Sequence, residues 1–235
     1  MGDWIAFWNA PHSIYVNAHH RDVHYRRIAE DITRYESAGG LVLDYGCGDA
    51  LHAEIAAKTA QQLILCEAAP KIREALAARF AGNTKIQVVS PEQVAAMQEQ
   101  SLDLIILHSV VQYLTEAELD SLLALFHRIL KPTGLLVIGD IIPPSVSAGT
   151  DAMELLRFAR RENFFSAALL GLVRTVFSNY WSLRSRLGLA RYHKDDFLAK
   201  LTAAGYFAVK ADKNIGHNRH RMTFNARTSI FGRPA

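Results

Sequence analysis

Short, continuously apolar segments alternate with longer amphipathic ones through the middle of the chain. Such runs are typical of parallel strands that are covered on both faces, and they occur at residues 41–45, 63–66, 86–89, 102–107 and 135–142. The segments between them carry apolar residues at helical spacing, at 50–60, 69–80, 92–99 and 116–130. This alternation predicts βαβ units with right-handed crossovers and an open sheet.

Three further regions complete a chain of 235 residues, a length that suits one large domain spanning residues 1–235. Residues 1–38 are polar, aromatic and rich in histidine, and we expect a helical cap with a helix over about 22–35. Residues 143–192 follow the fifth strand and predict a helical insert, or lid. The remainder predicts a helix at 194–204 and two strands at 206–211 and 221–231, joined by a polar linker.

The most informative stretch joins the first strand to the first helix. It reads Asp44-Tyr45-Gly46-Cys47-Gly48, and Glu67 ends the second strand about twenty residues later. Glycine lets the backbone approach a ligand closely, and a carboxylate at that second position can accept two hydrogen bonds from a ribose diol. Together these features predict a nucleoside site.

The loop differs from a dinucleotide-binding loop, because Leu51 stands where the third glycine of G-x-G-x-x-G would lie. It resembles the first motif of class I S-adenosylmethionine-dependent methyltransferases, with Asp44, Gly46 and Gly48 matching and Ala50 replacing the last glycine. Residues 101–106, 130–137 and 194–206 resemble later motifs of the same family, so the likeness covers about 35–142 and 193–235.

This resemblance implies a Rossmann-like, doubly wound α/β fold. The sheet would be mostly parallel and seven-stranded, with an antiparallel last strand. The implied cofactor is S-adenosylmethionine, and the residues expected to bind it are Asp44, Gly46, Cys47, Gly48, Glu67, Ala68, Glu92 and His108. Glu92 has an equally good alternative role, as an acid that complements the dipole of the following helix in its first turn.

The same resemblance shows which types of methyl transfer the end of the fourth strand does not fit. The segment Leu107-His108-Ser109-Val110 has neither the N-P-P-Y type of motif of some amino methyltransferases nor a Pro-Cys nucleophile. It also lacks the carboxylates with which catechol-type enzymes hold Mg²⁺. We therefore expect a metal-independent enzyme that methylates a small molecule or a lipid-like acceptor.

Two polar residues at strand ends are candidates for a catalytic base. His108 ends the fourth strand and Asp140 lies near the end of the fifth, where open α/β sheets bind ligands. Alternatively, His108 bounds the cofactor pocket and Asp140 caps a turn. Tyr15, His19 and His24 are expected in the roof of the site. His20 and His24 have metal-ligand spacing, but no third ligand is evident, so no metal site is predicted.

The insert is basic and aromatic. Residues 151–192 contain seven arginines against three acids, and these arginines are Arg157, Arg160, Arg161, Arg174, Arg184, Arg186 and Arg191. Such a surface favours an anionic or amphiphilic acceptor, or peripheral contact with an anionic membrane. An amphipathic cap packed on the domain or on a second subunit is the alternative interpretation, and the oligomeric state stays open.

The net charge and the cysteine content indicate which partners and which cellular compartment to expect. A formal net charge of +3 and the lack of a basic tail argue against a nucleic-acid partner. The two cysteines, Cys47 and Cys66, lie in apolar segments and are expected to be buried thiols in a cytoplasmic protein. No leader or membrane-spanning run is evident. The alternatives are a lipid- or quinone-type methyltransferase at a membrane surface and a non-catalytic S-adenosyl-binding domain.

Overall fold

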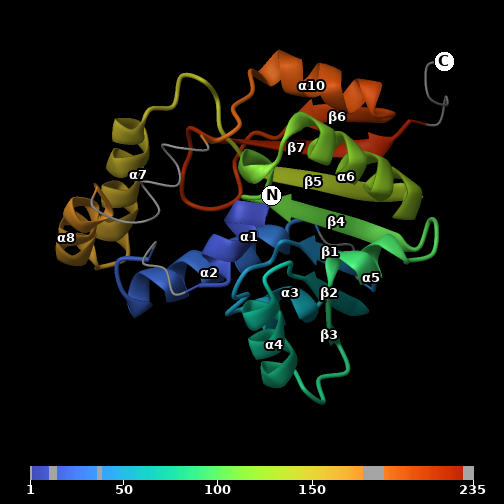
Figure 1. Cartoon of the computed structure of the whole chain (residues 1–235), viewed down its shortest axis with the longest axis horizontal. Helices are drawn as coiled ribbons and strands as arrows, with labels where there is room; N and C mark the ends of the chain where they lie inside the picture. The colour runs from blue at the N-terminus through green and yellow to red at the C-terminus, as the bar shows by residue number, and fades with distance from the viewer. Residues whose placement is uncertain (1, 11–14, 36–38, 177–187, 230–235) are drawn as a thin grey trace.

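A seven-stranded sheet with the order β3-β2-β1-β4-β5-β7-β6 organises the computed structural model, which describes residues 2–10, 15–35, 39–176 and 188–229 (Figure 1). The strands are β1 Leu41–Tyr45, β2 Gln62–Cys66, β3 Ile86–Val89, β4 Leu102–His108, β5 Leu130–Ile141, β6 Tyr206–Lys210 and β7 Met222–Thr228. Neighbouring strands from β3 to β5 pair in parallel, and β7 pairs antiparallel with both β5 and β6. The sequence prediction of a mostly parallel Rossmann-like sheet with an antiparallel last strand is confirmed.

Helices cover both faces of the sheet. They are α1 Gly2–Trp8, α2 Ala18–Ile32, α3 Ala53–Ala57, α4 Pro70–Arg79, α5 Pro91–Ala95, α6 Glu116–Ile129, α7 Ala148–Arg161, α8 Phe165–Val176 and α10 Lys194–Ala203, with a short 3-10 turn at Val111–Tyr113. Helices α5, α6 and α10 share one buried cluster with the sheet, and α2, α3 and α4 share the other. The layers are therefore helix, sheet and helix.

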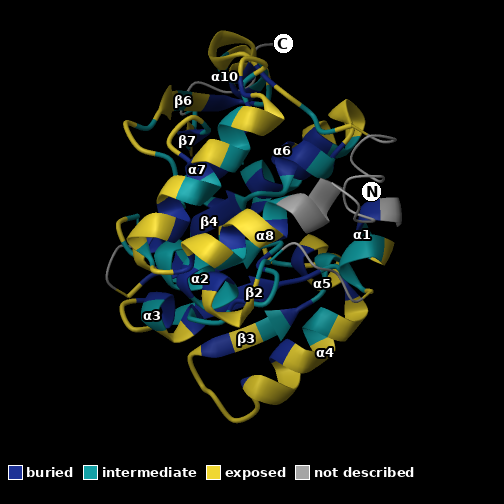
Figure 2. Ribbon diagram, turned by 90° about the vertical axis from the view of Figure 1, so that its left-hand side faces the viewer, coloured by how far each residue is buried: buried dark blue, intermediate teal, exposed yellow. Residues whose placement is uncertain are grey.

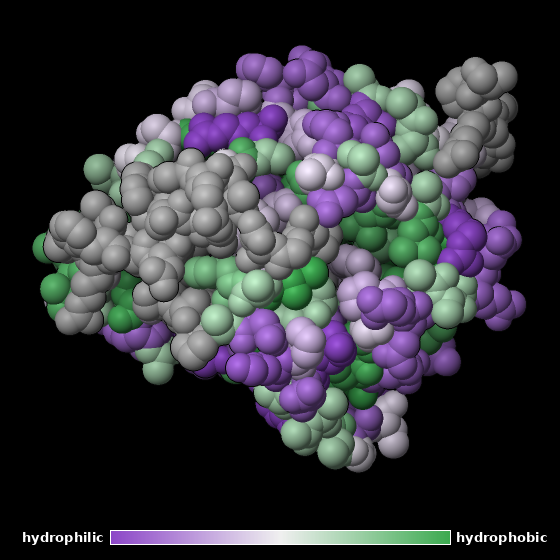
Figure 3. Space-filling view, viewed as in Figure 1, coloured by the Kyte–Doolittle hydropathy of each residue, from purple (hydrophilic) through white to green (hydrophobic). Residues whose placement is uncertain are grey.

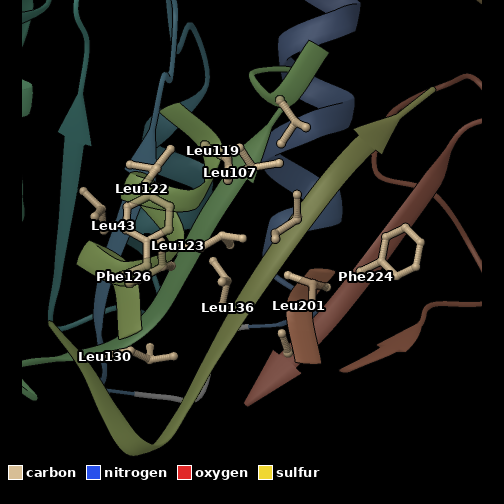
Figure 4. Packing of buried hydrophobic residues seen from close by; sticks show 14 of the residues in the cluster. Leu43, Leu107, Leu119, Leu122, Leu123, Phe126, Leu130, Leu136, Leu201 and Phe224 are labelled. Atoms are coloured by element: carbon tan, nitrogen blue, oxygen red, sulfur yellow. The ribbon is translucent and has the colours of Figure 1, made fainter. Parts of the chain in front are cut away.

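Alternate residues of the central strands supply these two cores. On β4, Ile105 and Leu107 join one cluster, whereas Leu104 and Ile106 join the other. Side chains of α6 pack against the first cluster at i, i+3, i+4 and i+7 spacing (Figure 4): Leu119, Leu122, Leu123 and Phe126. Burial on both faces explains why the strands lack the alternation of polar and apolar residues that a one-sided sheet shows.

Several element boundaries differ from the sequence prediction: α2 begins at Ala18 instead of about 22, α5 ends at Ala95 instead of 99, and β7 ends at Thr228 instead of 231. The fifth strand begins at Leu130, which pairs with Leu102, and the next pair is Leu104 with Leu135. The segment 131–134, predicted as a turn, is therefore part of β5, and a register shift against β4 accommodates it. The first helix after the glycine loop is only α3, Ala53–Ala57, instead of 50–60, and the φ of 40° at Ala50 excludes that residue from the start of the helix.

The N-terminal segment and the insert pack together. The predicted N-terminal cap contains α1 and α2, and the insert contains α7 and α8. A third buried cluster joins Val23 of α2 to the insert residues Phe158, Ala159, Phe164 and Ala168. In Figure 1 these four helices lie on the side toward which the arrow of β4 points, and in Figure 2 α7 and α8 stand in front of the strand ends. Among the described residues, no helix is long and apolar enough to cross a membrane.

Candidate active site

A cavity of about 400 Å³ lies at the carboxyl ends of the parallel strands. The glycine loop, the end of β2 and the end of β4 line it, and α2 and the insert cover it. A second, more polar chamber of about 170 Å³ lies beside it, bordered by β5 and the loop before β7. The residues lining both are His24, His108, Ser109, Asp151, His217 and Arg221. The two spaces therefore meet at the end of β4.

The glycine loop has the left-handed backbone that requires glycine. Gly46 and Gly48 have φ angles of 78° and 57°. There is also no room for a side chain at either position. A Cβ at Gly46 would lie 2.4 Å from Val110 Cγ2, and one at Gly48 would lie 2.5 Å from the hydroxyl of Tyr25. Tyr25 accepts a hydrogen bond from the Asp49 amide at 2.9 Å, so α2 holds the loop from outside. No motif in the sequence pointed to this contact.

Glu67 directly follows the last residue of β2, one position beyond the predicted strand end, and lines the cavity. Its two carboxylate oxygens accept hydrogen bonds from the backbone amides of Gly48 and Ala69, at 2.9 and 2.8 Å. Burial raises the pKa of this carboxyl, and these amide hydrogen bonds oppose the rise. Each carboxylate oxygen has further lone-pair capacity, so the group can also accept from a ribose diol.

The other predicted cofactor residues near the loop also lie at the cavity. Asp44, Cys47 and Ala68 line it. Burial, together with the nearby charge of Glu67, raises the pKa of Asp44 to about 7. Cys47 and Cys66 are buried free thiols, as expected, and burial raises the pKa of both, which makes them poor nucleophiles.

Glu92 lies elsewhere. It is exposed in the first turn of α5 and does not line either cavity. A hydrogen bond with the Ser90 side chain lowers its pKa, and its position complements the positive end of the helix. This placement favours the alternative role given above, and the predicted contact of Glu92 with the cofactor stays a prediction.

His108 occupies the last position of β4, beside Gly139 of β5. A Cβ at Gly139 would lie 2.8 Å from His108 Nδ1, so only a glycine at this position leaves room for the imidazole ring. Nδ1 is buried without a hydrogen-bond partner among the described residues. Burial lowers the pKa of His108 although Asp140 opposes this, so the imidazole is neutral at pH 7. A neutral imidazole can accept a proton.

Asp140 lies next to this histidine, in a network of ions and hydrogen bonds. Its Oδ2 accepts from Ser109 Oγ at 2.6 Å and from Arg221 at 2.6 Å, and Arg221 also reaches Asp151 at 3.0 Å. Burial disfavours the charged form, but Arg221, His108 and Ser109 together hold the pKa of Asp140 below its ordinary value. A carboxylate stabilised in this way is a weak proton acceptor.

The backbone at this point is strained. Ser109 and Asp140 both have positive φ angles, of 58° and 67°, and their side chains are hydrogen-bonded to each other across the ends of β4 and β5. Non-glycine residues adopt this conformation infrequently, and it costs about 1–3 kcal/mol. The surrounding ion pairs over-determine it, which is characteristic of a functional site.

Sequence analysis missed Arg221 and His217. Arg221 directly precedes β7, whose first residue Met222 pairs with Ile141. A residue at the start of an antiparallel last strand must lie at the carboxyl end of its parallel neighbour, and this rule could have placed Arg221 beside Asp140. His217 belongs to the polar linker before β7 and stacks on Phe158 of α7, with ring centroids 4.5 Å apart.

The predicted roof residues divide into two groups. Tyr15 and His24 line the cavity, whereas His19 points its Nε2 at the carbonyl of Glu162 in the insert, 2.7 Å away. Burial lowers the pKa of His20 to about 4 and that of His24 well below its usual value. His12 lies outside the described residues. No set of three or more potential metal ligands is assembled within the described residues.

The insert contributes apolar and acidic groups to the cavity. Asp151, Leu155 and Leu172 line it. Of the arginines, Arg157 pairs with Glu154, and Arg191 donates to the carbonyls of Pro144 and Val146. Arg160 and Arg161 are exposed at the end of α7. The side chains of Arg174, Arg184 and Arg186 lie outside the described part of the chain, as do Phe177, Tyr180 and Trp181.

We expect the double change Arg160→Gln and Arg161→Gln to leave S-adenosylhomocysteine affinity within about twofold, under about 0.5 kcal/mol. Both side chains are exposed on the outer end of α7 and absent from the cavity wall. Isothermal titration calorimetry measures the effect. Arg73→Gln is the contrasting variant, because Arg73 donates to the Glu67 carbonyl at 2.7 Å and should lower that affinity. Equal losses in both variants would contradict this division.

The fold and the site together define a class of protein, the Rossmann-like methyltransferases. Residues 43–138 match a family described as a methyltransferase domain. This match covers the glycine loop, Glu67 and His108. No curated protein matches the sequence. The match therefore shows a methyltransferase domain over residues 43–138, within a Rossmann-like sheet, and the cofactor that it implies is S-adenosylmethionine.

Solved structures share this fold at low sequence identity. The 1,6-didemethyltoxoflavin-N1-methyltransferase of Burkholderia thailandensis, solved with bound 1,6-didemethyltoxoflavin and S-adenosylhomocysteine, has a TM-score of 0.60 at 15% identity, over 97% of this chain and 90% of that one. A putative S-adenosylmethionine-dependent methyltransferase of Methanococcus maripaludis has a TM-score of 0.58 at 17% identity, with 90% and 88% covered. The N-methyltransferase NodS of Bradyrhizobium japonicum, in complex with S-adenosylhomocysteine, has a TM-score of 0.57 at 14% identity, with 96% of each chain covered.

Proposed function

We propose that this enzyme transfers the methyl group of S-adenosylmethionine to a small-molecule acceptor without the help of a metal ion. The observation that carries the proposal is the continuity of the two cavities. One is lined by Gly46, Gly48 and Glu67, and it meets a separate polar chamber at His108. A chamber of about 170 Å³ suits the end group of a small molecule.

The cofactor site fits an adenosyl group by its chemistry. Glu67 offers carboxylate oxygens to a diol, and Ala68 and Ile72 offer apolar surface beside it. S-adenosylmethionine supplies an activated methyl group when bound. The protein then has to orient the acceptor, exclude water and, for an acceptor with a high pKa, remove a proton.

His108 is the residue that we propose as the base. It lies where the two cavities meet, and its imidazole is neutral at pH 7. Asp140 is the second candidate, but its carboxylate is stabilised by Arg221 and Ser109, so we assign it to positioning. The guanidinium of Arg221 bridges Asp140 and Asp151, and this charge occupies the position between the two carboxylates that a metal ion would need.

A lipid-like acceptor is the second candidate, and one surface feature favours it. Phe165, Leu169 and Leu170 on α8 are about half exposed, at 45%, 52% and 52%. Hydrophobic atoms are visible where α8 lies, at the left edge of Figure 3. Arg160 and Arg161 are exposed at the end of the preceding helix. An apolar surface with nearby arginines is suited to an anionic membrane surface.

The test is a labelled-methyl transfer assay. The purified protein is incubated with deuteromethyl S-adenosylmethionine and either the low-molecular-mass fraction of a cell extract, total lipid in vesicles, or the protein fraction. Mass spectrometry then finds products heavier by one labelled methyl group. A product in the first fraction supports the proposal, and one only in the vesicles supports the second candidate.

Calorimetry with S-adenosylhomocysteine and NAD provides the control for the cofactor. We expect S-adenosylhomocysteine to bind in the micromolar range and NAD to bind more weakly. Binding of S-adenosylhomocysteine without labelled product in any fraction would favour a non-catalytic binding domain. Tighter binding of NAD would overturn the cofactor assignment itself.

A further inference from the structure

Exposed apolar side chains are concentrated on the two helices of the insert. Among the described residues, six large apolar side chains are exposed, and four of them, each about half exposed, lie on α7 and α8: Met153, Phe165, Leu169 and Leu170. The other two, Phe207 and Val209, lie on the edge strand β6. Single apolar residues on a surface are ordinary, but a group of them on two adjacent helices indicates a contact surface.

Arginines share this side of the insert. The residues Met153, Arg157, Arg160 and Arg161 follow one another at i, i+4, i+7 and i+8 on α7, so their side chains leave one face of the helix. Arg160 and Arg161 are exposed, and within the described residues no acid pairs with either. Arg157 pairs with the buried Glu154 but leaves 48% of its side chain exposed. We call these three arginines and the four apolar residues of α7 and α8 the outer face of the insert.

The outer face has no acidic counterpart. Of the described side chains of α7, α8 and the loop between them, none that is exposed is acidic. The acids of this segment are turned inward instead, since Asp151 lines the cavity and Glu154 is buried. The outer face is therefore both basic and apolar.

The opposite sides of the same helices face the active site. Leu155 of α7 and Leu172 of α8 line the larger cavity, and Phe158 and Ala168 pack with Val23 of α2 in the third buried cluster. Figure 2 shows α7 and α8 at the front of the molecule, with exposed positions of both helices turned toward the viewer. None of the described arginine side chains of the insert lines either cavity. These arginines are therefore not placed to bind the acceptor, and the outer face is available to a partner outside the enzyme.

A second copy of the chain does not suit this face. In a two-fold symmetric dimer the same surface of both subunits meets, so the outer face would lie against itself. Arg160 and Arg161 would then approach the same arginines of the other copy, and like charges brought together at an interface are costly. Among its described side chains, the outer face offers no acid to balance them.

A nucleic acid would satisfy only the arginines. Its phosphates attract cations, but Leu169 and Leu170 would find no apolar partner on the polyanionic backbone. An anionic bilayer satisfies both kinds of group, because its headgroups attract arginines while the boundary with the acyl chains accepts apolar side chains. The outer face therefore matches a bilayer by charge and by hydropathy.

We infer that the outer face of the insert binds the enzyme reversibly to an anionic lipid bilayer. The bilayer is a docking partner and not the methyl acceptor, so the inference goes beyond the proposed function and holds for a small-molecule acceptor as well. Binding of this kind needs no membrane-spanning helix, since Phe165, Leu169 and Leu170 enter only the interfacial region. It places α7 and α8, and behind them the active-site cavity, at the membrane surface.

Co-sedimentation of the native chain with lipid vesicles tests the inference. One set of vesicles is phosphatidylcholine alone, and the other is an equimolar mixture of phosphatidylcholine and phosphatidylglycerol. We expect the protein to bind the mixed vesicles about tenfold or more tightly than the neutral ones, and this binding to weaken as salt screens the arginines. No binding to the mixed vesicles, or equal binding to both sets, would overturn the inference.

Two leucines test the apolar part of the contact. The double change Leu169→Gln and Leu170→Gln should weaken binding to the mixed vesicles about tenfold or more, because it removes side chains that enter the interface. The matched control is Phe207→Gln with Val209→Gln, which removes two exposed apolar side chains from β6 and should leave binding within about twofold. Equal losses in the two variants would show that general hydrophobicity holds the protein on the vesicles, and would refute the outer face as the docking site.

Two arginines test the electrostatic part. The double change Arg160→Gln and Arg161→Gln should also weaken binding to the mixed vesicles about tenfold or more. The matched control removes the same charge elsewhere, by Lys71→Gln on α4 with Lys210→Gln on β6, which are both exposed, and should leave binding within about threefold. If both variants lose binding equally, net charge alone attracts the protein and the inference is wrong.

Calorimetry and light scattering complete the test. Each variant should keep its S-adenosylhomocysteine affinity within about twofold, which shows that it is folded. A native dimer that the change Leu169→Gln with Leu170→Gln separates into monomers would make the outer face a subunit interface and overturn the inference. The affinity for S-adenosylhomocysteine tests the cofactor site of the proposed function, whereas vesicle binding tests only the outer face, so the two failures are distinguishable.

Discussion

Replacing His108 with glutamine is expected to lower turnover by about 10²–10⁴-fold, the usual contribution of a general base. Glutamine preserves polarity and approximate size but cannot accept a proton at pH 7. His108 lies at the end of β4, where the cofactor cavity meets the polar chamber. Single-turnover measurements with excess enzyme give the rate. S-adenosylhomocysteine affinity should stay within about threefold, which shows that the variant is folded and can bind cofactor.

The pH dependence gives this prediction a second readout. Burial lowers the pKa of His108 below its usual value of about 6.5. The base acts in its neutral form, so the native rate should be constant near pH 7 and fall only below pH ~6.5, as the pH passes through the lowered pKa. The glutamine variant should lack this acidic limb. A variant with turnover within threefold of the native enzyme would show that His108 only bounds the pocket.

Replacing Glu67 with alanine is expected to weaken S-adenosylhomocysteine binding by about 1–3 kcal/mol, the loss typical of hydrogen bonds to a charged group. Two effects combine. The carboxylate offers acceptors for a ribose diol, and it also accepts from the amides of Gly48 and Ala69, which hold the glycine loop in place. Calorimetry measures the affinity. Glu74→Ala, at an exposed position on α4, is the matched control and should bind normally.

Thermal unfolding separates the two effects of Glu67. If its main role is to hold the loop, Glu67→Ala should lower the melting temperature without ligand, and Glu67→Gln should restore part of it because the amide oxygen still accepts. If its main role is to bind the cofactor, the stabilisation by added S-adenosylhomocysteine should fall in both variants. Unchanged affinity in Glu67→Ala would remove this residue from the cofactor site.

Much of the fold could be predicted because it depends on local pattern. Continuous apolar runs such as that of β4 are buried on both faces of a sheet, and this requirement appears in any single strand. The glycine loop was equally visible, because positive φ angles at Gly46 and Gly48 restrict the residue type. Boundaries were less predictable. Ala50 breaks the expected helix with a conformation that its residue type gives no reason to expect.

The acceptor site depended on contacts between distant segments. Arg221 and Asp140 are 81 positions apart, and they meet because β7 enters the sheet antiparallel beside β5. His24 and His217 join them from an N-terminal helix and a late linker, neither of which has a distinctive spacing. The direction in which the insert arginines point was also not encoded in their number. Charge along a sequence fixes only how many ions there are, and tertiary packing decides which of them border the substrate and which face water.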